Sequence, residues 1–222
     1  DLCEWDAKSL LRAYGFPVPH ARLFEREVDV PGEIPATGII KAQTLFGGRG
    51  KAGLVRRAGN DPEATVAIIG NALAERGLPQ VMMIEQASAF KTELYISVVL
   101  DDLTGSPALM FSNRGGIDIE DNGNVHSLPL PADSSVYAHE LVDFFISAGA
   151  PTAAGARLAR LAADLVRMFR HEDMTMIEIN PLVVTGEGRL MALDCKATLD
   201  DSARYRHRDR SFDLSRRLAD FK

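Results

Sequence analysis

The stretch from Met176 to Ala197 decides the fold, and it reads MIEINPLVVTGEGRLMALDCKA. Two apolar runs flank the loop Gly186-Glu187-Gly188, a pattern typical of a β-hairpin. A loop of that length pairs Asn180 on the first strand with Asp194 on the second. Directly opposed side chains of paired strands are close neighbours on one face. We therefore expect an amide and a carboxylate to lie side by side on this hairpin.

The same pairing places Glu178 opposite Lys196, on the face that also carries Asn180. Polar groups on a buried strand pair are costly unless partners or an ion satisfy them. An amide oxygen beside a carboxylate suits a hard cation such as Mg²⁺. The alternative is an ordinary cross-strand arrangement, in which Glu178 and Lys196 form an ion pair and Asn180 caps the turn into Pro181.

The composition is that of a globular protein, with 46% hydrophobic residues among 222. A net charge of -6 gives no overall basic field, so we expect no nucleic-acid partner. No apolar run approaches the roughly 20 residues that span a bilayer, and no signal peptide is visible. The chain begins at Asp1 and not at Met, which indicates a trimmed chain or a fragment. Cys3 and Cys195 are too few for a disulfide framework, which favours a reducing compartment, the cytoplasm or the matrix of a mitochondrion.

The rest of the chain alternates between helical patterns and short apolar runs. Helices are predicted for residues 1–14, for 61–77, from 136 onward, and for the charge-rich 204–222. Within the third of these, a buried face is predicted for Leu158, Leu161, Leu165 and Phe169. Strands are predicted for residues 21–24, 37–43, 54–58, 80–86, 92–100 and 108–113. Mixed strands and helices in this order indicate an α/β or α+β fold.

A glycine-dense segment, Gly48-Arg49-Gly50-Lys51-Ala52-Gly53, matches the pattern G-x-G-x-x-G. A dinucleotide site needs a helix to begin there, but the following residues 54–57 look extended. A Walker loop is excluded because Leu45 stands where its first glycine belongs. What remains is a glycine flap between two strands, whose backbone amides, Arg49 and Lys51 cover phosphates. The alternative is a plain glycine turn with solvated side chains.

Lys41 lies within an apolar strand, where a solvated lysine is unexpected. Its functional role would be a point charge on a nucleotide phosphate, and its alternative is a lysine that extends from an edge strand to solvent. The apolar run 81–86 ends in polar residues and is followed by Ser88 and Glu93. Such a strand end offers a nucleoside an apolar slot with polar groups at its rim. Taken alone, Glu85 and Glu93 are ordinary exposed carboxylates.

Together, these motifs resemble the ATP-grasp domain of the succinyl-CoA synthetase β-subunit family, over nearly the whole chain and in the family's order. The motifs are Ala7-Lys8-x-Leu10-Leu11-x-x-Tyr14-Gly15, Ile40-Lys41-Ala42-Gln43, Gly47-Gly48-Arg49-Gly50-Lys51-Ala52-Gly53, Ile84-Glu85, Glu93-Leu94-Tyr95, Ile177-Glu178-Ile179-Asn180-Pro181-Leu182-Val183 and Leu193-Asp194-x-Lys196. The resemblance implies an α+β, ATP-grasp fold in which two α+β subdomains clasp a nucleotide. Residues 21–86 would form the smaller, inserted nucleotide-binding subdomain, and residues 1–20 with 87–222 the larger subdomain with the metal site.

The resemblance also implies the roles of individual residues. The residues implied to hold ATP, or GTP, are Lys41, the backbone of Gly48-Arg49-Gly50, Glu85, Ser88 and Glu93. Those implied to hold Mg²⁺ are Asn180 and Asp194. Glu178 matches a glutamate that contacts a phosphohistidine, and it is the implied catalytic side chain together with Arg49. Phosphoryl transfer needs positioning and charge neutralisation more than covalent chemistry from the protein, which agrees with these roles.

The implied activity is that of an NDP-forming acid–CoA ligase. The γ-phosphoryl group would pass to a histidine on a partner, a CoA-binding α-type subunit. The family's β chain continues into a CoA-ligase domain, and this sequence is expected to stop near its beginning. Two departures bear on the acid substrate: Cys195 replaces a small residue, with its side chain expected to point away from the metal face, and Arg114 stands where an acidic residue is known. The alternatives are a stand-alone nucleotide-binding regulatory module and another ATP-grasp carboxylate ligase.

Overall fold

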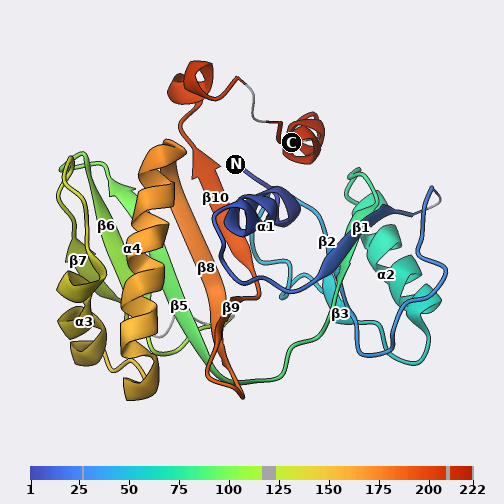
Figure 1. Cartoon of the computed structure of the whole chain (residues 1–222). Coiled ribbons are helices and arrows are strands. Elements are labelled where there is room, and N and C mark those ends of the chain that lie inside the picture. Colours follow the sequence, from blue (N-terminus) through green and yellow to red (C-terminus); the bar gives the residue numbers. More distant parts are fainter. Residues whose placement is uncertain (27, 117–123, 209–210, 222) are drawn as a thin grey trace. The chain divides into compact units, whose positions relative to one another are not determined.

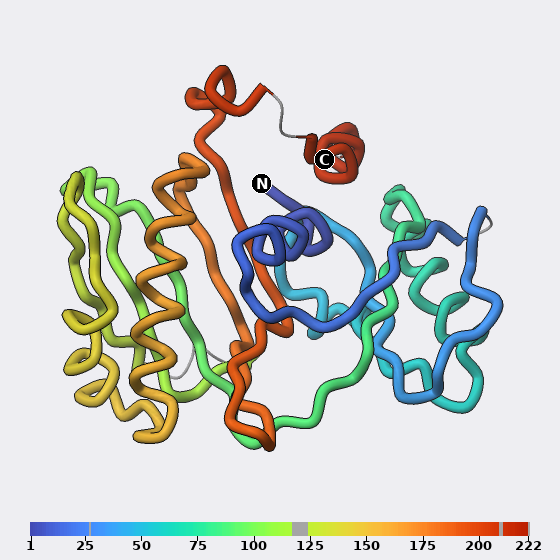
Figure 2. Tube along the Cα trace, viewed as in Figure 1, coloured from blue at the N-terminus to red at the C-terminus, as the bar shows by residue number. Residues whose placement is uncertain are grey.

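The computed structural model describes residues 1–26, 28–116, 124–208 and 211–221 (Figure 1), and Figure 2 traces the same chain. Contacts within the chain divide it into two compact units. The larger unit comprises Asp1, Ala7–Val18 and Ala89–Ser211, and the smaller unit comprises Leu2–Asp6, Pro19–Ser88 and Phe212–Lys222. Helix α1 (Glu4–Ala13) therefore contributes its first turn to the smaller unit and its remainder to the larger unit.

The smaller unit contains an antiparallel sheet of four strands in the order β1-β4-β2-β3. The strands are β1 (Ala21–Glu25), β2 (Ile39–Ala42), β3 (Val55–Arg57) and β4 (Val81–Glu85). Helix α2 (Pro62–Ala74) begins where predicted, because the Asp61 side chain accepts a hydrogen bond from the Ala64 amide at 2.9 Å. Its buried Ile69 and Leu73 belong to the core that covers one face of the sheet.

The larger unit contains a six-stranded antiparallel sheet in the order β10-β8-β5-β6-β7, with β9 also paired to β8. The strands are β5 (Phe90–Asp101), β6 (Ser106–Ser112), β7 (His126–Pro129), β8 (Met174–Thr185), β9 (Leu190–Ala192) and β10 (Cys195–Leu199). The six strands predicted before the hairpin are present with ends that differ by at most two residues, whereas β7 was not predicted.

Helices α3 (Ala138–Ser147) and α4 (Gly155–His171) pack against each other beside this sheet (Figure 1). A single helical pattern was predicted from residue 136, but Gly149 with φ +74 and Pro151 separate two helices there. The predicted core face of α4 is confirmed: Leu158, Leu161, Leu165 and Phe169 are all buried. One face of the sheet is therefore closed by apolar side chains.

The C-terminal residues form the 3-10 helix η2 (Asp201–Arg206) and helix α5 (Asp213–Ala219), where a single charged helix was predicted. In the smaller unit, the buried Ser215 of α5 binds the first turn of α1, because its hydroxyl donates to Asp6 Oδ2 at 2.6 Å and accepts from the Cys3 amide at 2.9 Å. Among the residues described, no helix is long and apolar enough to cross a membrane.

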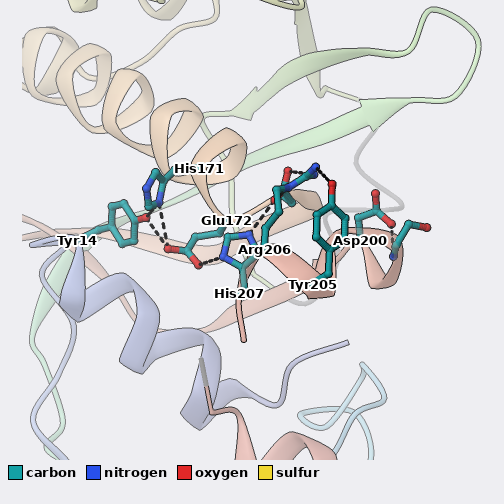
Figure 3. Close-up of polar contacts among 9 residues, drawn as sticks. Tyr14, His171, Glu172, Asp200, Tyr205, Arg206 and His207 are labelled. Atoms are coloured by element: carbon teal, nitrogen blue, oxygen red, sulfur yellow. Dashed lines mark hydrogen bonds and ion pairs between the residues drawn. The ribbon is translucent and has the colours of Figure 1, made fainter. Parts of the chain in front are cut away.

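The turn from α4 into β8 is held by a polar cluster within the larger unit (Figure 3). Tyr14 donates to Glu172 Oε1 at 2.5 Å and also contacts His171. Glu172 is 2% exposed and lies between Tyr14 and His207 (Figure 3). The next residue, Asp173, has φ +49, and its carboxylate accepts hydrogen bonds from Arg206 Nη2 at 2.7 Å and Nε at 2.9 Å. This cluster lies directly before β8, which begins at Met174.

Replacing Asp173 with asparagine is expected to lower the Tm at pH 7 by about 2–4 °C, because the Arg206 ion pair loses its charge while asparagine still tolerates a positive φ. Hydrogen bonds from Arg206 hold the pKa of Asp173 below its usual range. A depressed folded-state pKa gives stability that is present above the unfolded value of about 3.9 and is lost as pH falls through the folded value. The difference in Tm between the two proteins should therefore be constant from pH 7 to about pH 5 and shrink as the pH falls toward 3, with the exposed Asp133→Asn as the control. A constant difference down to pH 3 would contradict the assignment.

Candidate functional site

The predicted hairpin register is confirmed in the larger unit. Glu178 pairs with Lys196, and Leu182 pairs with Ala192. The second strand is interrupted at residues 193–194, which divides it into β9 and β10. At this interruption the backbone N–H of Asn180 donates a hydrogen bond to the backbone carbonyl of Asp194 at 3.3 Å. The predicted amide and carboxylate residues are therefore neighbours, on a strand pair whose other face is closed by buried apolar residues.

Asn180 is held by a glycine pair from another part of the chain. Its Oδ1 accepts from the Gly116 amide at 2.7 Å, and its Nδ2 donates to the Gly116 carbonyl at 3.2 Å. Gly116 has φ +103, and Gly115 approaches the backbone of β5 so closely that a Cβ on it would lie 2.4 Å from the Leu94 carbonyl oxygen. The close approach orients the amide oxygen of Asn180.

Replacing Gly115 with alanine is expected to lower the free energy of unfolding by about 1–3 kcal/mol, because the added methyl group meets backbone that cannot rotate away. Gly186→Ala is the matched control, since a Cβ there meets nothing within 4 Å, and we expect a change within about 0.5 kcal/mol. Urea denaturation of both variants measures the difference. Equal stability would show that the glycine pair is not constrained by β5.

The donor set on this strand pair fits a hard divalent cation. Asp194 is half-buried, and its Oδ1 accepts from the Cys195 amide at 2.8 Å, which fixes the carboxylate. A carbonyl oxygen has two lone pairs, so Asn180 Oδ1 can bind both the Gly116 amide and a cation. Within the described ranges no group of three or more His, Cys, Asp or Glu side chains has the arrangement of a metal cage. Two oxygen ligands instead suit Mg²⁺, which keeps several waters and takes further oxygens from phosphates.

Glu178 lies beside two buried residues that sequence reasoning missed, Tyr95 and Ser97. The Tyr95 hydroxyl lies 3.2 Å from Glu178 Oε2 and 3.0 Å from Ser97 Oγ. Ser97 pairs with Glu178 across β5 and β8. Tyr95 and Ser97 are two residues apart on β5, so their side chains lie on the same face. This alternation is the sequence signal that could have identified them as a pair. Lys196, opposite Glu178, is exposed.

In the smaller unit, two of the predicted phosphate-binding cations, Lys41 and Arg49, lie together in the interior, whereas the third, Lys51, is exposed. Lys41 Nζ is 2.7 Å from Glu85 Oε2 and 2.9 Å from Glu4 Oε1. Arg49 Nη2 is 2.5 Å from Glu4 Oε2, and its Nη1 donates to the Ala42 carbonyl at 2.9 Å. Both cationic side chains are 8% exposed. A buried charge is tolerated when an opposite charge lies beside it, and each of these charges has an opposite charge within 2.9 Å.

This geometry excludes the solvated alternatives for Lys41, Arg49 and Glu85, while their binding of a nucleotide stays a prediction. Lys41 is not an edge-strand lysine, because β2 lies between β3 and β4. Arg49 is not solvated, and Glu85, at 3% exposed, is not an ordinary exposed carboxylate. The glycine segment forms a turn between β2 and β3, which both the flap and the plain glycine turn require. Two of its amides serve the turn itself, since those of Ala52 and Gly53 donate to carbonyls within the segment at 3.0 and 3.1 Å.

The predicted nucleotide residues do not all belong to one unit. Lys41, the Gly48-Arg49-Gly50 backbone, Glu85 and Ser88 belong to the smaller unit. Glu93 belongs to the larger unit, on β5, where a Cβ on Gly116 would lie 2.8 Å from its Oε2. Glu93 therefore lies near the residue that holds Asn180, while Ser88 follows β4 in the smaller unit.

The two cysteines have no place in either group of polar residues. Cys195 pairs with Ile179 and is buried, so its side chain points away from the face of Glu178, as predicted. Cys3 is also buried, and burial raises the pKa of its thiol to about 11. Neither thiol is therefore an activated nucleophile.

Comparison with known sequences identifies the family of this chain, because a family model and curated relatives agree. A family model described as an ATP-grasp domain matches residues 1–184. The chain is 36% identical over 217 residues to the succinate–CoA ligase [ADP-forming] subunit beta 2 of Streptomyces coelicolor, covering 93% of this chain and 55% of that protein. It is 30% identical over 224 residues to the corresponding subunit beta of Methanocaldococcus jannaschii, covering 96% and 60%. The chain thus spans little more than half the length of these curated relatives.

Comparison with solved structures identifies the same fold. ATP citrate lyase from Methanothrix soehngenii, in complex with citrate and coenzyme A, matches with a TM-score of 0.68 and 26% identity, over 92% of this chain and 52% of that one. An acetyl-coenzyme A synthetase from Ca. Korarchaeum cryptofilum, in complex with coenzyme A and Ca-AMPCP, matches with a TM-score of 0.65 over 90% and 93% of the two chains. At 19% identity the second match bears on the fold alone.

Proposed function

The chain belongs to the ATP-grasp domain family, and we propose from this that it is the nucleotide-binding part of an NDP-forming acid–CoA ligase, similar to the succinyl-CoA synthetase β subunit. In this proposal it binds Mg-ATP and passes the γ-phosphoryl group to a histidine of a CoA-binding α-type partner subunit. The observation that carries the proposal is the strand register that makes Asn180 and Asp194 neighbours, two residues from Glu178.

Residues of the smaller unit are proposed to bind the nucleotide. Lys41 and Arg49 would neutralise phosphate oxygens, as buried cations do in other phosphoryl-transfer proteins. The backbone of Gly48-Arg49-Gly50 would approach the phosphates, because a glycine segment leaves no side chain in the way. Glu85 and Ser88 at the end of β4, with Glu93 of the larger unit, would contact the nucleoside. GTP is the alternative nucleotide.

Residues of the larger unit are proposed to carry the metal and the acceptor contact. Asn180 and Asp194 would hold Mg²⁺, and a bound Mg²⁺ supplies charge neutralisation for the phosphate oxygens. Glu178, oriented by the Tyr95 hydroxyl, would accept a hydrogen bond from the acceptor imidazole and stabilise its positive charge as ADP leaves. Such positioning and electrostatic stabilisation are the main contributions that proteins make to phosphoryl transfer.

The experiment that tests the proposal is phosphoryl transfer from γ-labelled ATP to an α-type partner subunit in the presence of Mg²⁺. We expect label on a partner histidine, recognised because its phosphoramidate bond is stable in alkali and labile in acid. Mg-ATP binding with no label on the partner would favour a regulatory nucleotide-binding module instead. Formation of an amide from an acid and an amine, without partner or coenzyme A, would identify another ATP-grasp carboxylate ligase.

A further inference from the structure

The carboxylate of Glu4 joins the two buried cations of the smaller unit. One of its oxygens lies 2.9 Å from Lys41 Nζ, and the other lies 2.5 Å from Arg49 Nη2. The Glu4 side chain is only 1% exposed. Sequence analysis gave Glu4 no role, and an acidic residue in the first turn of a helix ordinarily does no more than interact with the helix dipole. In the structure, Glu4 instead contacts two specific cations, Lys41 and Arg49.

The first turn of α1 is fixed to β2 next to this contact. The Trp5 amide donates to Gln43 Oε1 at 2.9 Å, and Gln43 is fully buried. Gln43 Nε2 in turn donates to the carbonyls of Lys41 and Ala42, each at 3.3 Å. The backbone that carries Glu4 and the strand that carries Lys41 are therefore held in register by neutral hydrogen bonds. The Glu4 carboxylate has little freedom to move away from the cations.

Each cation is held from two sides. Lys41 contacts Glu4 and Glu85, and Arg49 contacts Glu4 and the Ala42 carbonyl. If a phosphate displaced Glu4, its carboxylate would stay in the interior without its cationic partners, which is the costly way to break a buried ion pair. Binding with Glu4 in place avoids this cost. The arrangement therefore favours a carboxylate that remains with the cations over one that a ligand must expel.

We propose that Glu4 is a positioning residue, which holds the Lys41 ammonium and the Arg49 guanidinium where nucleotide phosphates bind. The proposal rests on the proposed function, in which these two cations contact the phosphates. A lysine on a strand, held by a glutamate on a helix, serves the same purpose in protein kinases. Because Glu4 acts only through the two cations, its effect should fall on phosphate binding and not on binding of the nucleoside.

The test compares ligands with and without phosphates, using calorimetry on the full chain. Glu4→Gln keeps the size of the side chain and removes its charge. We expect the Kd for Mg-ATP to rise about 10–100-fold, because displaced binding groups cost roughly this factor, while the Kd for adenosine changes less than about twofold. Glu4→Asp, which keeps the charge, should recover part of the lost affinity. Glu33→Gln, at an exposed position of the same unit, is the control and should bind both ligands normally.

Each outcome decides the proposal. Tighter Mg-ATP binding by Glu4→Gln would overturn it, because Glu4 would then compete with phosphates. Equal losses for Mg-ATP and adenosine would also overturn it and indicate a purely structural role. If Glu4→Gln fails to fold, Glu4→Asp is used instead. The proposal then requires that the Kd for Mg-ATP divided by the Kd for adenosine be larger in Glu4→Asp than in the unaltered chain. Failure of the unaltered chain to bind Mg-ATP would refute the proposed function itself and is recognised before any variant is measured.

Discussion

Replacement of Asp194 with alanine is expected to weaken Mg-ATP binding by about 100-fold or more and to remove its dependence on Mg²⁺ concentration. The carboxylate is the only charged group among the two proposed ligands, and even loss of groups that merely orient metal ligands costs about 10–100-fold in affinity. Its Oδ1 is fixed by the Cys195 amide, so the ligand geometry is set before a metal arrives. Calorimetric titration of ATP at several Mg²⁺ concentrations measures the effect.

A second variant and a control separate metal binding from stability. Asn180→Ala should also weaken Mg-ATP binding, but it removes the two hydrogen bonds to Gly116 as well, so its Tm must be measured alongside. The exposed Asp133→Ala should leave affinity and Mg²⁺ dependence unchanged. If Asp194→Ala and Asn180→Ala both behave like Asp133→Ala, the metal site lies elsewhere.

The second large effect is expected for Glu178→Gln, which should slow phosphoryl transfer to the partner histidine by about 10²–10⁴-fold. A carboxylate that orients an imidazole and stabilises its positive charge contributes on this order, and glutamine keeps the shape without the charge. Mg-ATP affinity should change less than about twofold, because Glu178 is not among the proposed metal or nucleotide ligands. Rapid-quench measurement of label transfer from γ-labelled ATP gives the rate.

Tyr95→Phe provides the comparison for Glu178. It keeps the buried ring but removes the hydroxyl that lies 3.2 Å from Glu178 Oε2, so the carboxylate keeps its charge and loses one restraint. We expect a loss of transfer rate that is smaller than that of Glu178→Gln, again with unchanged Mg-ATP affinity. A transfer rate in Glu178→Gln equal to that of the unaltered chain would remove Glu178 from the acceptor contact.

Local sequence patterns were enough to predict which residues of β8 share one face of the larger sheet and which residues of the next strand they oppose. A loop of known length and strict alternation of side chains determine strand register, since a slip of one residue would turn every side chain of β8 to the opposite face. This is why the pairing of Glu178 with Lys196 was predictable without any knowledge of the rest of the chain. The extended residues after the glycine segment likewise excluded a dinucleotide fold, and β3 is present there.

Contacts between distant segments were not predictable in this way. Tyr95 reaches Glu178, and Gly116 reaches Asn180, across sheet pairings that no local pattern specifies. The inward position of Lys41 was suggested by its apolar neighbours, but the identity of its partners was not, because any carboxylate in the chain was a candidate. An acidic residue in the first turn of a helix is common and is explained by the helix dipole, so it does not by itself predict a contact with a buried cation.

By itself, the sequence determined the strands other than β7, the hairpin register and the family, because strand alternation, turn residues and ordered motifs are local properties of the chain. The tertiary structure alone decided that Glu4 joins Lys41 and Arg49, and that residues 2–6 and 212–222 group with the smaller unit. The physical reason is that burying charge requires partners, and the partners come from whichever segments the packing of apolar faces brings near.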